Sequence, residues 1–207
     1  MRSLGDARLY LVAPARLRAG PLAVLVPELA DAGVDIVQLR EKEMAVDEVA
    51  RVAEPILAAC RDAGIVFIVN DHPEIAATLG ADGVHVGQDD ASVAEARGVV
   101  GDAIVGLSTH SRAQIDAAKS TGPDYIAVGP VFETPTKPGR PGVGFELIRS
   151  AAAEGPDVWF AIGGIDASNL DRVLEAGARR IVVVRAITES LDPPSAARAL
   201  KAKLPPG

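Results

Sequence analysis

Aromatic residues and cysteine are scarce in this chain. Only 3% of its 207 residues are aromatic although 48% are hydrophobic, so a core must be built from Ala, Val, Leu and Ile. The single cysteine, Cys60, excludes an intramolecular disulfide and favours a cytoplasmic location. We expect Cys60 to be a small buried side chain and not a catalytic thiol.

Long apolar runs and clusters of positive charge are also lacking. No apolar run approaches the roughly 20 residues of a membrane-spanning helix, and residues 1–20 show no signal-peptide pattern. The formal net charge is −7, and no stripe of Lys and Arg is present. We therefore expect neither a membrane nor a nucleic acid as a partner. A pocket that concentrates cations can still bind anions, and a homo-oligomer stays open.

Short apolar runs rich in β-branched residues alternate with helical patterns along the chain. Several runs are apolar at consecutive positions, which is typical of parallel strands covered on both faces. The predicted strands are 8–13, 34–40, 65–70, 83–87, 103–107, 125–128, 158–162 and 180–184. The predicted helices are 21–33, 49–64, 72–79, 91–98, 111–120, 144–153, 168–177 and 195–203, with Asp166 and Ser168 as caps of the 168–177 helix.

Eight such units predict a single-domain α/β fold, the (β/α)8 TIM barrel, over residues 1–207 with a short frayed tail at 204–207. The alternative is an open doubly wound sheet. It is disfavoured because no G-x-G-x-x-G follows the first strand.

In a barrel, functional groups gather where the strands end. Gln38, Arg40 and Lys42 share one parity at the end of the second strand, so they would project together from the mouth. Arg and Lys suit a phosphate or pyrophosphate. The alternative is an ordinary charged loop with Glu41 and Glu43 as counterions.

Carboxylates follow the next two strands. Asn70 and Asp71 end the third, and Asp89 and Asp90 follow the fourth. Two carboxylates at neighbouring strand ends could share Mg²⁺, although Asn-Asp is also a common turn or cap. No Cys/His cluster supports zinc, and we expect His85 to be a core residue.

The remaining strand ends carry hydroxyl groups, a cation and glycine amides. Ser108 ends the fifth strand, where it could bind a substrate or cap a helix. The loop 129–144 contains Thr134, Thr136 and Lys137 and has the length of a lid. Gly163-Gly164 and the amides after the eighth strand could hold a phosphate or merely make tight turns. Each feature alone has a structural explanation, but together they suit phosphates and Mg²⁺ on one rim.

These motifs resemble the thiamine-phosphate synthase family from about residue 10 to residue 200. The matching segments are QLREK (38–42), ND (70–71), ADGVHVGQDD (81–90), GLSTHS (106–111), VGPVFETPTK (128–137) and AIGGI (161–165). They occur in the family's order, and GQ-x-D together with T-x-TK is a specific combination. The family's fold is the (β/α)8 barrel expected above.

The resemblance implies a transferase that joins a pyrimidine pyrophosphate to a thiazole phosphate with Mg²⁺ as cofactor. Arg40, Lys42 and Lys137 would be catalytic, and Asp71 and Asp90 would hold Mg²⁺, since GQ-x-D ends at Asp90 and not at Asp89. The implied pyrimidine-pyrophosphate site comprises Gln38, Leu39, Arg40, Glu41, Lys42, Asn70, Ser108 and Lys137. The implied thiazole-phosphate site comprises Thr134, Pro135, Thr136, Gly164, Val184 and Arg185.

One position departs from the family pattern, because Arg185 stands where the family usually has serine. The backbone amide would be kept there, whereas a hydroxyl contact would be lost. Two alternatives compete with this interpretation. A related thiazole tautomerase-like isomerase would use His110 for proton transfer, but it lacks the GQ-x-D aspartate and the T-x-TK loop. A non-catalytic phosphate-ligand-binding barrel would bind without turnover.

Overall fold

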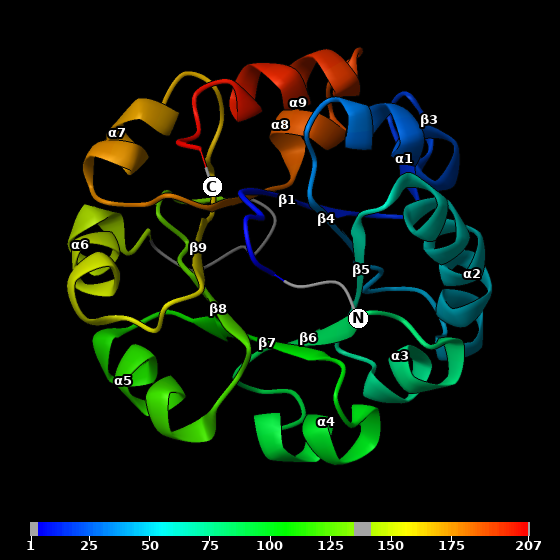
Figure 1. Ribbon diagram of the computed structural model, residues 1–207, viewed down its shortest axis with the longest axis horizontal. Helices are drawn as coiled ribbons and strands as arrows, with labels where there is room; N and C mark the ends of the chain where they lie inside the picture. Colours follow the sequence, from blue (N-terminus) through cyan, green and yellow to red (C-terminus); the bar gives the residue numbers. More distant parts are fainter. Residues whose placement is uncertain (1–3, 135–141, 207) are drawn as a thin grey trace.

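The computed structural model describes residues 4–134 and 142–206 of the chain. Eight parallel strands close into a barrel in the order β1-β10-β9-β8-β7-β6-β5-β4, inside a ring of helices (Figure 1). The barrel strands are β1 (Leu9–Ala13), β4 (Ile36–Leu39), β5 (Val66–Asn70), β6 (Gly83–Val86), β7 (Ile104–Thr109), β8 (Tyr125–Val128), β9 (Trp159–Ile162) and β10 (Ile181–Val183). The predicted (β/α)8 barrel is confirmed, and the open sheet is excluded because β1 pairs with β10.

Helices follow the strands and cover the outside of the barrel. They are α1 (Leu22–Asp31), α2 (Val46–Ala63), α3 (Pro73–Leu79), α4 (Val93–Val100), α5 (Arg112–Thr121), α6 (Gly144–Glu154), α7 (Leu170–Glu175), α8 (Arg185–Thr188) and α9 (Pro193–Lys201). The sequence did not predict α8 or the small hairpin of β2 (Arg16–Leu17) and β3 (Gly20–Pro21). Elements of two to four residues are too short to show a hydrophobic period.

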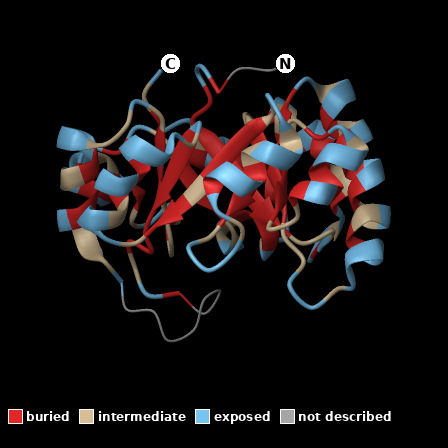
Figure 2. Cartoon of the chain, turned by 90° about the horizontal axis from the view of Figure 1, so that it is seen from below, coloured by how far each residue is buried: buried red, intermediate tan, exposed pale blue. Residues whose placement is uncertain are grey.

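The strands separate two apolar layers, because successive side chains point to opposite faces. In β1, Tyr10 and Val12 point into the barrel, where they belong to the inner cluster with Ile36, Ile68 and Phe160. Leu9 and Leu11 point outward and pack in the larger cluster beneath the helices. Figure 2 shows the result, with buried strands at the centre and exposed outer faces on the helices. Cys60 is fully buried, as expected.

A glycine in β7 makes room for Tyr125, one of the two tyrosines in the barrel interior. A Cβ on Gly106 would lie 2.1 Å from Cζ of Tyr125, a ring that is 1% exposed and has no space to withdraw. We expect Gly106→Ala to lower the free energy of unfolding by about 3 kcal/mol through overpacking. Urea unfolding followed by circular dichroism measures the change.

The matched control for that substitution is Gly98→Ala. Gly98 lies in α4 and has no atom within 4 Å of the added Cβ. Alanine there is expected to raise the free energy of unfolding by up to about 1 kcal/mol through helix propensity. Equal effects of the two substitutions would contradict the packing explanation.

One carboxylate joins the amino ends of β1 and β4 to the last helix. Asp35, directly before β4, accepts hydrogen bonds from the backbone amides of Arg8 (2.7 Å) and Leu9 (2.9 Å). It also pairs with Nζ of Lys201 at the end of α9 at 2.6 Å. The last helix is therefore tied to the first strands at the end of the barrel opposite the strand carboxyl ends.

Two local predictions differ from the structure. Helix α7 begins at Leu170 with Asn169 as its N-cap and no side-chain cap bond. Asp166 instead accepts from the amide (2.8 Å) and hydroxyl (2.6 Å) of Ser168, closing a preceding turn. The tail is not frayed from residue 204, because Leu204 is buried against the outer apolar cluster. None of the described helices is long and apolar enough to cross a bilayer.

Candidate active site

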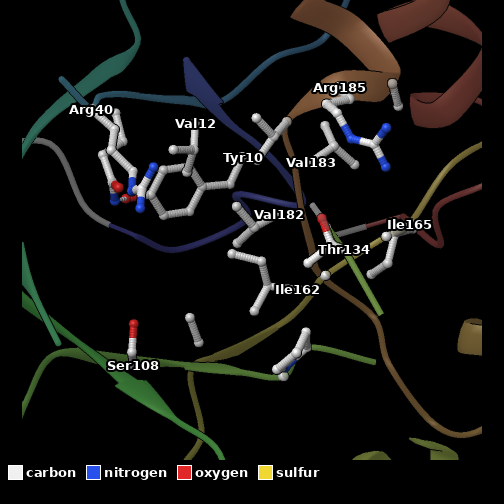
Figure 3. Close-up of a pocket in the computed structure, with 18 of the residues that line it drawn as sticks. Tyr10, Val12, Arg40, Ser108, Thr134, Ile162, Ile165, Val182, Val183 and Arg185 are labelled. Atoms are coloured by element: carbon white, nitrogen blue, oxygen red, sulfur yellow. Dashed lines mark hydrogen bonds between the residues drawn. The ribbon is translucent and has the colours of Figure 1, made fainter. Parts of the chain in front are cut away.

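A cavity of about 280 Å³ opens at the carboxyl ends of the strands. One part of its wall is polar and consists of Gln38, Asn70, His85 and Ser108. Its middle is lined by apolar side chains that include Ile162 and Val182. Arg40 and Arg185 lie on opposite sides of it in Figure 3. One cavity therefore combines two cationic ends with an apolar middle.

Side chains at the end of β4 alternate between the cavity and the outer apolar layer, as their parity predicts. Gln38 and Arg40 line the cavity, whereas Leu39 is buried in the outer apolar layer. Lys42 is exposed and does not line the cavity. Its positive charge acts to lower the pKa of the Asp71 carboxyl. Glu41 accepts a hydrogen bond from the backbone amide of Ala15 at 2.6 Å, so it fastens the loop after β1.

The guanidinium of Arg40 has a buried donor that is suited to binding an anion. Its Nη2 is buried without a hydrogen-bond partner among the described residues. Burial lowers the pKa of Arg40, and the charges of Asp71 and Asp90 oppose that shift. A desolvated donor without a partner is costly unless a ligand satisfies it.

The structure brings together the two carboxylates that the sequence singled out. Burial, and then hydrogen bonding and repulsion from Asp90, raise the pKa of the Asp71 carboxyl. Asp71 has a left-handed backbone with φ 63°, and its amide donates to the carbonyl of His85 at 2.9 Å. Oδ2 of Asp90 accepts from the amide of Gly87 at 2.8 Å. Two adjacent carboxylates beside a cationic mouth favour a cation between them.

Two carboxylates form a donor set of the kind that Mg²⁺ takes. No group of three or more His, Cys, Asp or Glu side chains that could hold a metal ion occurs within residues 4–134 and 142–206. Mg²⁺ commonly takes one or two carboxylates and completes its shell with waters and substrate phosphates. A Cβ on Gly87 would lie 2.6 Å from Oδ2 of Asp90, so the missing side chain leaves room for this carboxylate.

The opposite side of the cavity is formed by glycines and the start of α8. Gly164, Val184 and Arg185 all line it, together with buried Thr134. Gly163 and Gly164 have positive φ values of 107° and 68°, a conformation that glycine adopts without strain. Arg185 is 43% exposed and lies 4.0 Å from Glu189. Pro135, Thr136 and Lys137 lie outside the described residues.

Both ends of the predicted 129–144 lid are held by backbone hydrogen bonds, the first end to β9 and the residue that follows it. The amides of Val131 and Phe132 donate to the carbonyls of Ile162 (2.8 Å) and Gly163 (3.1 Å). On the far side, the amide of Val143 donates to the carbonyl of Pro130 at 2.7 Å. Closure of the 129–144 loop stays a prediction.

Sequence reasoning missed several cavity residues. Tyr10 lines the cavity and His85 forms part of its wall, with both ring nitrogens hydrogen-bonded. The parity that His85 shares with Gly83 and Gly87 was the available signal, and the expectation of a plain core residue was incomplete. His110 also lines the cavity, with Nδ1 2.6 Å from the carbonyl of Gly129.

Fold and site together define a (β/α)8-barrel protein with a cationic cavity at the carboxyl ends of its strands, an arrangement typical of enzymes for phosphorylated small molecules. The family model described as thiamine monophosphate synthase matches residues 9–187. The chain therefore belongs to the thiamine monophosphate synthase family.

Individual relatives agree over nearly the whole length. The chain is 51% identical to a thiamine-phosphate synthase of Acidothermus cellulolyticus over 98% of this chain and 97% of that protein. It is 53% identical to one of Thermus thermophilus over 83% and 84% of the two chains. The solved thiamine phosphate pyrophosphorylase of Pyrococcus furiosus superposes with a TM-score of 0.85 at 28% identity, covering 94% of each chain.

Proposed function

We propose that the chain is a transferase that joins 4-amino-2-methyl-5-hydroxymethylpyrimidine pyrophosphate to 4-methyl-5-(2-hydroxyethyl)thiazole phosphate, releasing pyrophosphate and thiamine phosphate. The observation that carries this proposal is that one cavity has Arg40 at one side and Arg185 at the other. Such a cavity accommodates two anionic groups with an uncharged reacting region between them. Membership of the family supports the identity of the two substrates.

The pyrophosphate half is assigned to the side of Arg40. Arg40, Lys42 and Lys137 neutralise the charge that develops on the departing pyrophosphate. Gln38, Asn70 and Ser108 contact the pyrimidine, while Leu39 and Glu41 hold the strand end and the neighbouring loop. The buried and unpaired Nη2 of Arg40 supports this assignment.

Magnesium is proposed at Asp71 and Asp90. When bound there, Mg²⁺ supplies Lewis-acid stabilisation to the oxygens of the leaving pyrophosphate. The contact between the two carboxyl groups and the raised pKa of Asp71 support a cation at this place.

The thiazole phosphate is assigned to the side of Arg185. Its phosphate is held by Thr134, Thr136, Gly164 and the amides of Val184 and Arg185, with Pro135 shaping the loop. Arg185 adds a cation where the family usually has serine. The cavity lining by Thr134, Gly164, Val184 and Arg185 supports this half of the assignment.

The reaction requires no protein nucleophile. The bond between the pyrimidine methylene and the pyrophosphate oxygen breaks, and the electron pair leaves with pyrophosphate. The thiazole nitrogen then donates its electron pair to the methylene cation. The protein aligns the two halves and stabilises the leaving group. The apolar middle of the cavity and closure of the 129–144 loop keep water from capturing the cation.

A cytoplasmic location is proposed as well, supported by the single cysteine and the absence of a possible disulfide. The proposed partners are the two phosphorylated substrates, without nucleic acid or membrane. The formal net charge of −7 supports the exclusion of nucleic acid. Assembly into a homo-oligomer is left open.

The decisive test supplies the purified protein with both phosphorylated substrates. We expect thiamine phosphate and pyrophosphate in equal amounts, and no product when EDTA removes Mg²⁺ or either substrate is omitted. Binding without pyrophosphate release would identify a phosphate-ligand-binding barrel instead. Metal-independent isomerisation of the thiazole would identify a tautomerase-like isomerase.

A further inference from the structure

A continuous chain of four hydrogen bonds crosses the interior of the barrel below the cavity. Nε2 of Gln38 donates to the hydroxyl of Tyr10 at 2.5 Å, which lies 2.8 Å from the hydroxyl of Tyr125. That hydroxyl is 2.9 Å from Nδ1 of His85, and Nε2 of His85 is 2.9 Å from Oγ of Ser108. Tyr10 and Tyr125 come from β1 and β8, which are not neighbours in the sheet, so the chain spans the barrel.

The orientation of the Gln38 amide implies one direction for the hydrogen bonds in this chain. The amide nitrogen of Gln38 can only donate, so the oxygen of Tyr10 accepts. Burial raises the pKa of both phenols well above the ordinary value, so each keeps its proton. Tyr10 is 1% exposed, and with its oxygen already accepting from Gln38, the oxygen of Tyr125 at 2.8 Å is the acceptor within reach of its proton.

The same direction continues to the other end of the chain. Tyr125 has accepted one bond and donates its own proton to Nδ1 of His85. When its ring is neutral, as above the ordinary imidazole pKa, His85 then carries its hydrogen on Nε2 and donates it to Oγ of Ser108. The amide oxygen of Gln38 remains as an acceptor for a ligand, and the hydroxyl proton of Ser108 remains as a donor.

The surrounding packing holds the chain in place. The rings of Tyr125 and His85 stack with centroids 5.5 Å apart, and Tyr10 and Phe160 contact Tyr125 edge-on. Gln88 donates to the backbone carbonyl of Ser108 at 2.6 Å. To reverse the direction of the chain, all four hydrogen bonds would have to exchange donor and acceptor together and the amide of Gln38 would have to rotate. The hydrogen-bonding states of Gln38 and Ser108 at its two ends therefore cannot change independently.

We propose that Tyr10, Tyr125 and His85 form a positioning relay that fixes an acceptor at Gln38 and a donor at Ser108 and so determines which pyrimidine the cavity accepts. This inference rests on the proposed function. An aminopyrimidine offers an exocyclic amino donor and an unprotonated ring nitrogen as acceptor, which complements that pattern. An oxo-pyrimidine offers a carbonyl acceptor and a ring N–H donor, which opposes it. A site built around fixed hydrogen bonds discriminates strongly against such an analogue.

The first test removes the central hydroxyl with Tyr125→Phe, which keeps the ring and its packing. We expect kcat/KM for the aminopyrimidine pyrophosphate to fall roughly 10- to 100-fold, mainly through KM. The preference for it over the oxo analogue should fall at least about tenfold, because the relay no longer fixes His85. Equal losses for both analogues would show a merely structural role and overturn the proposal.

The matched control is Thr109→Val. It also removes a buried hydroxyl from the barrel, one residue beyond Ser108, where Oγ1 of Thr109 donates to the carbonyl of Ala127 at 3.2 Å. Thr109 is 0% exposed but lies outside the relay. The preference for the aminopyrimidine should be unchanged in this variant, and a loss like that of Tyr125→Phe would overturn the proposal.

The second test reads the direction of the relay without substrate. The chain has three histidines, and ¹⁵N NMR at about pH 8.5, above the ordinary imidazole pKa, identifies which nitrogen of each ring is protonated. The His85 signals are assigned by their loss in His85→Gln or, should that variant not fold, by elimination with His72→Gln and His110→Gln.

We expect His85 to be protonated on Nε2 in the unmodified protein and to become a mixture of tautomers in Tyr125→Phe. Protonation on Nδ1 in the unmodified protein overturns the inference. This outcome is independent of the proposed function, whose failure would appear as the absence of thiamine phosphate while the Nε2 tautomer persists.

Discussion

Replacement of Arg40 by methionine is expected to lower kcat/KM by roughly 10³-fold, the scale for removing one preorganised donor from a developing negative charge. Arg40 lies at the cavity wall with Nη2 buried and unpaired within the described part of the chain. Methionine keeps much of the apolar volume and removes only the charge and donors. Steady-state kinetics with both substrates measures the loss.

The control for this substitution is Arg51→Met on α2. The side chain of Arg51 is 69% exposed and pairs with Asp47 on the same helix, so its loss should leave turnover unchanged. The melting temperature of Arg40→Met should be equal to or higher than that of the unmodified protein, because an unsatisfied buried charge has been removed. Near-native turnover in Arg40→Met would remove Arg40 from the mechanism.

Replacement of Asp71 or Asp90 by asparagine is expected to weaken the apparent affinity for Mg²⁺ by at least about 100-fold, since losing a direct ligand costs no less than losing an outer-shell partner. Asparagine tolerates the left-handed backbone of Asp71, and its oxygen can still accept from Gly87 at position 90. The substitutions therefore change charge with little change in shape. Titration of turnover against Mg²⁺ concentration measures the effect.

Asp89→Asn provides the matched control, because Asp89 is the exposed neighbour of Asp90 that the family pattern does not use. We expect its Mg²⁺ requirement to equal that of the unmodified protein. An Asp89 variant as impaired as the Asp90 variant, or an Asp71 variant with an unaltered Mg²⁺ requirement, would contradict the proposed site.

Hydrophobic patterning predicted the barrel strands because each is a short apolar run between helical periods. β8 was predicted at residues 125–128, as observed. β7 runs to Thr109, two residues beyond the predicted end at Leu107. Ser108 and Thr109 are polar, so the apolar run stopped before them, whereas pairing with Ala127 and Val128 on β8 extends the strand.

The grouping of Gln38, Arg40, Asn70 and Ser108 around one cavity could be expected from their places at strand ends. The relay could not, because contacts across a barrel depend on the stagger of strands that are far apart in sequence. Tyr10 sits in the middle of an apolar run, and nothing local to it indicates a partner on β8. The family roles of all the site residues remain predictions, and Pro135, Thr136 and Lys137 also lie outside the described residues.

The carboxylate of Asp35 joins the first strands and the last helix at the end of the barrel remote from Arg40 and Asp71. Substitutions around that junction would change the stability of the barrel without changing the residues that line the cavity. Thermal stability and substrate selectivity can therefore change separately, one at each end of the barrel.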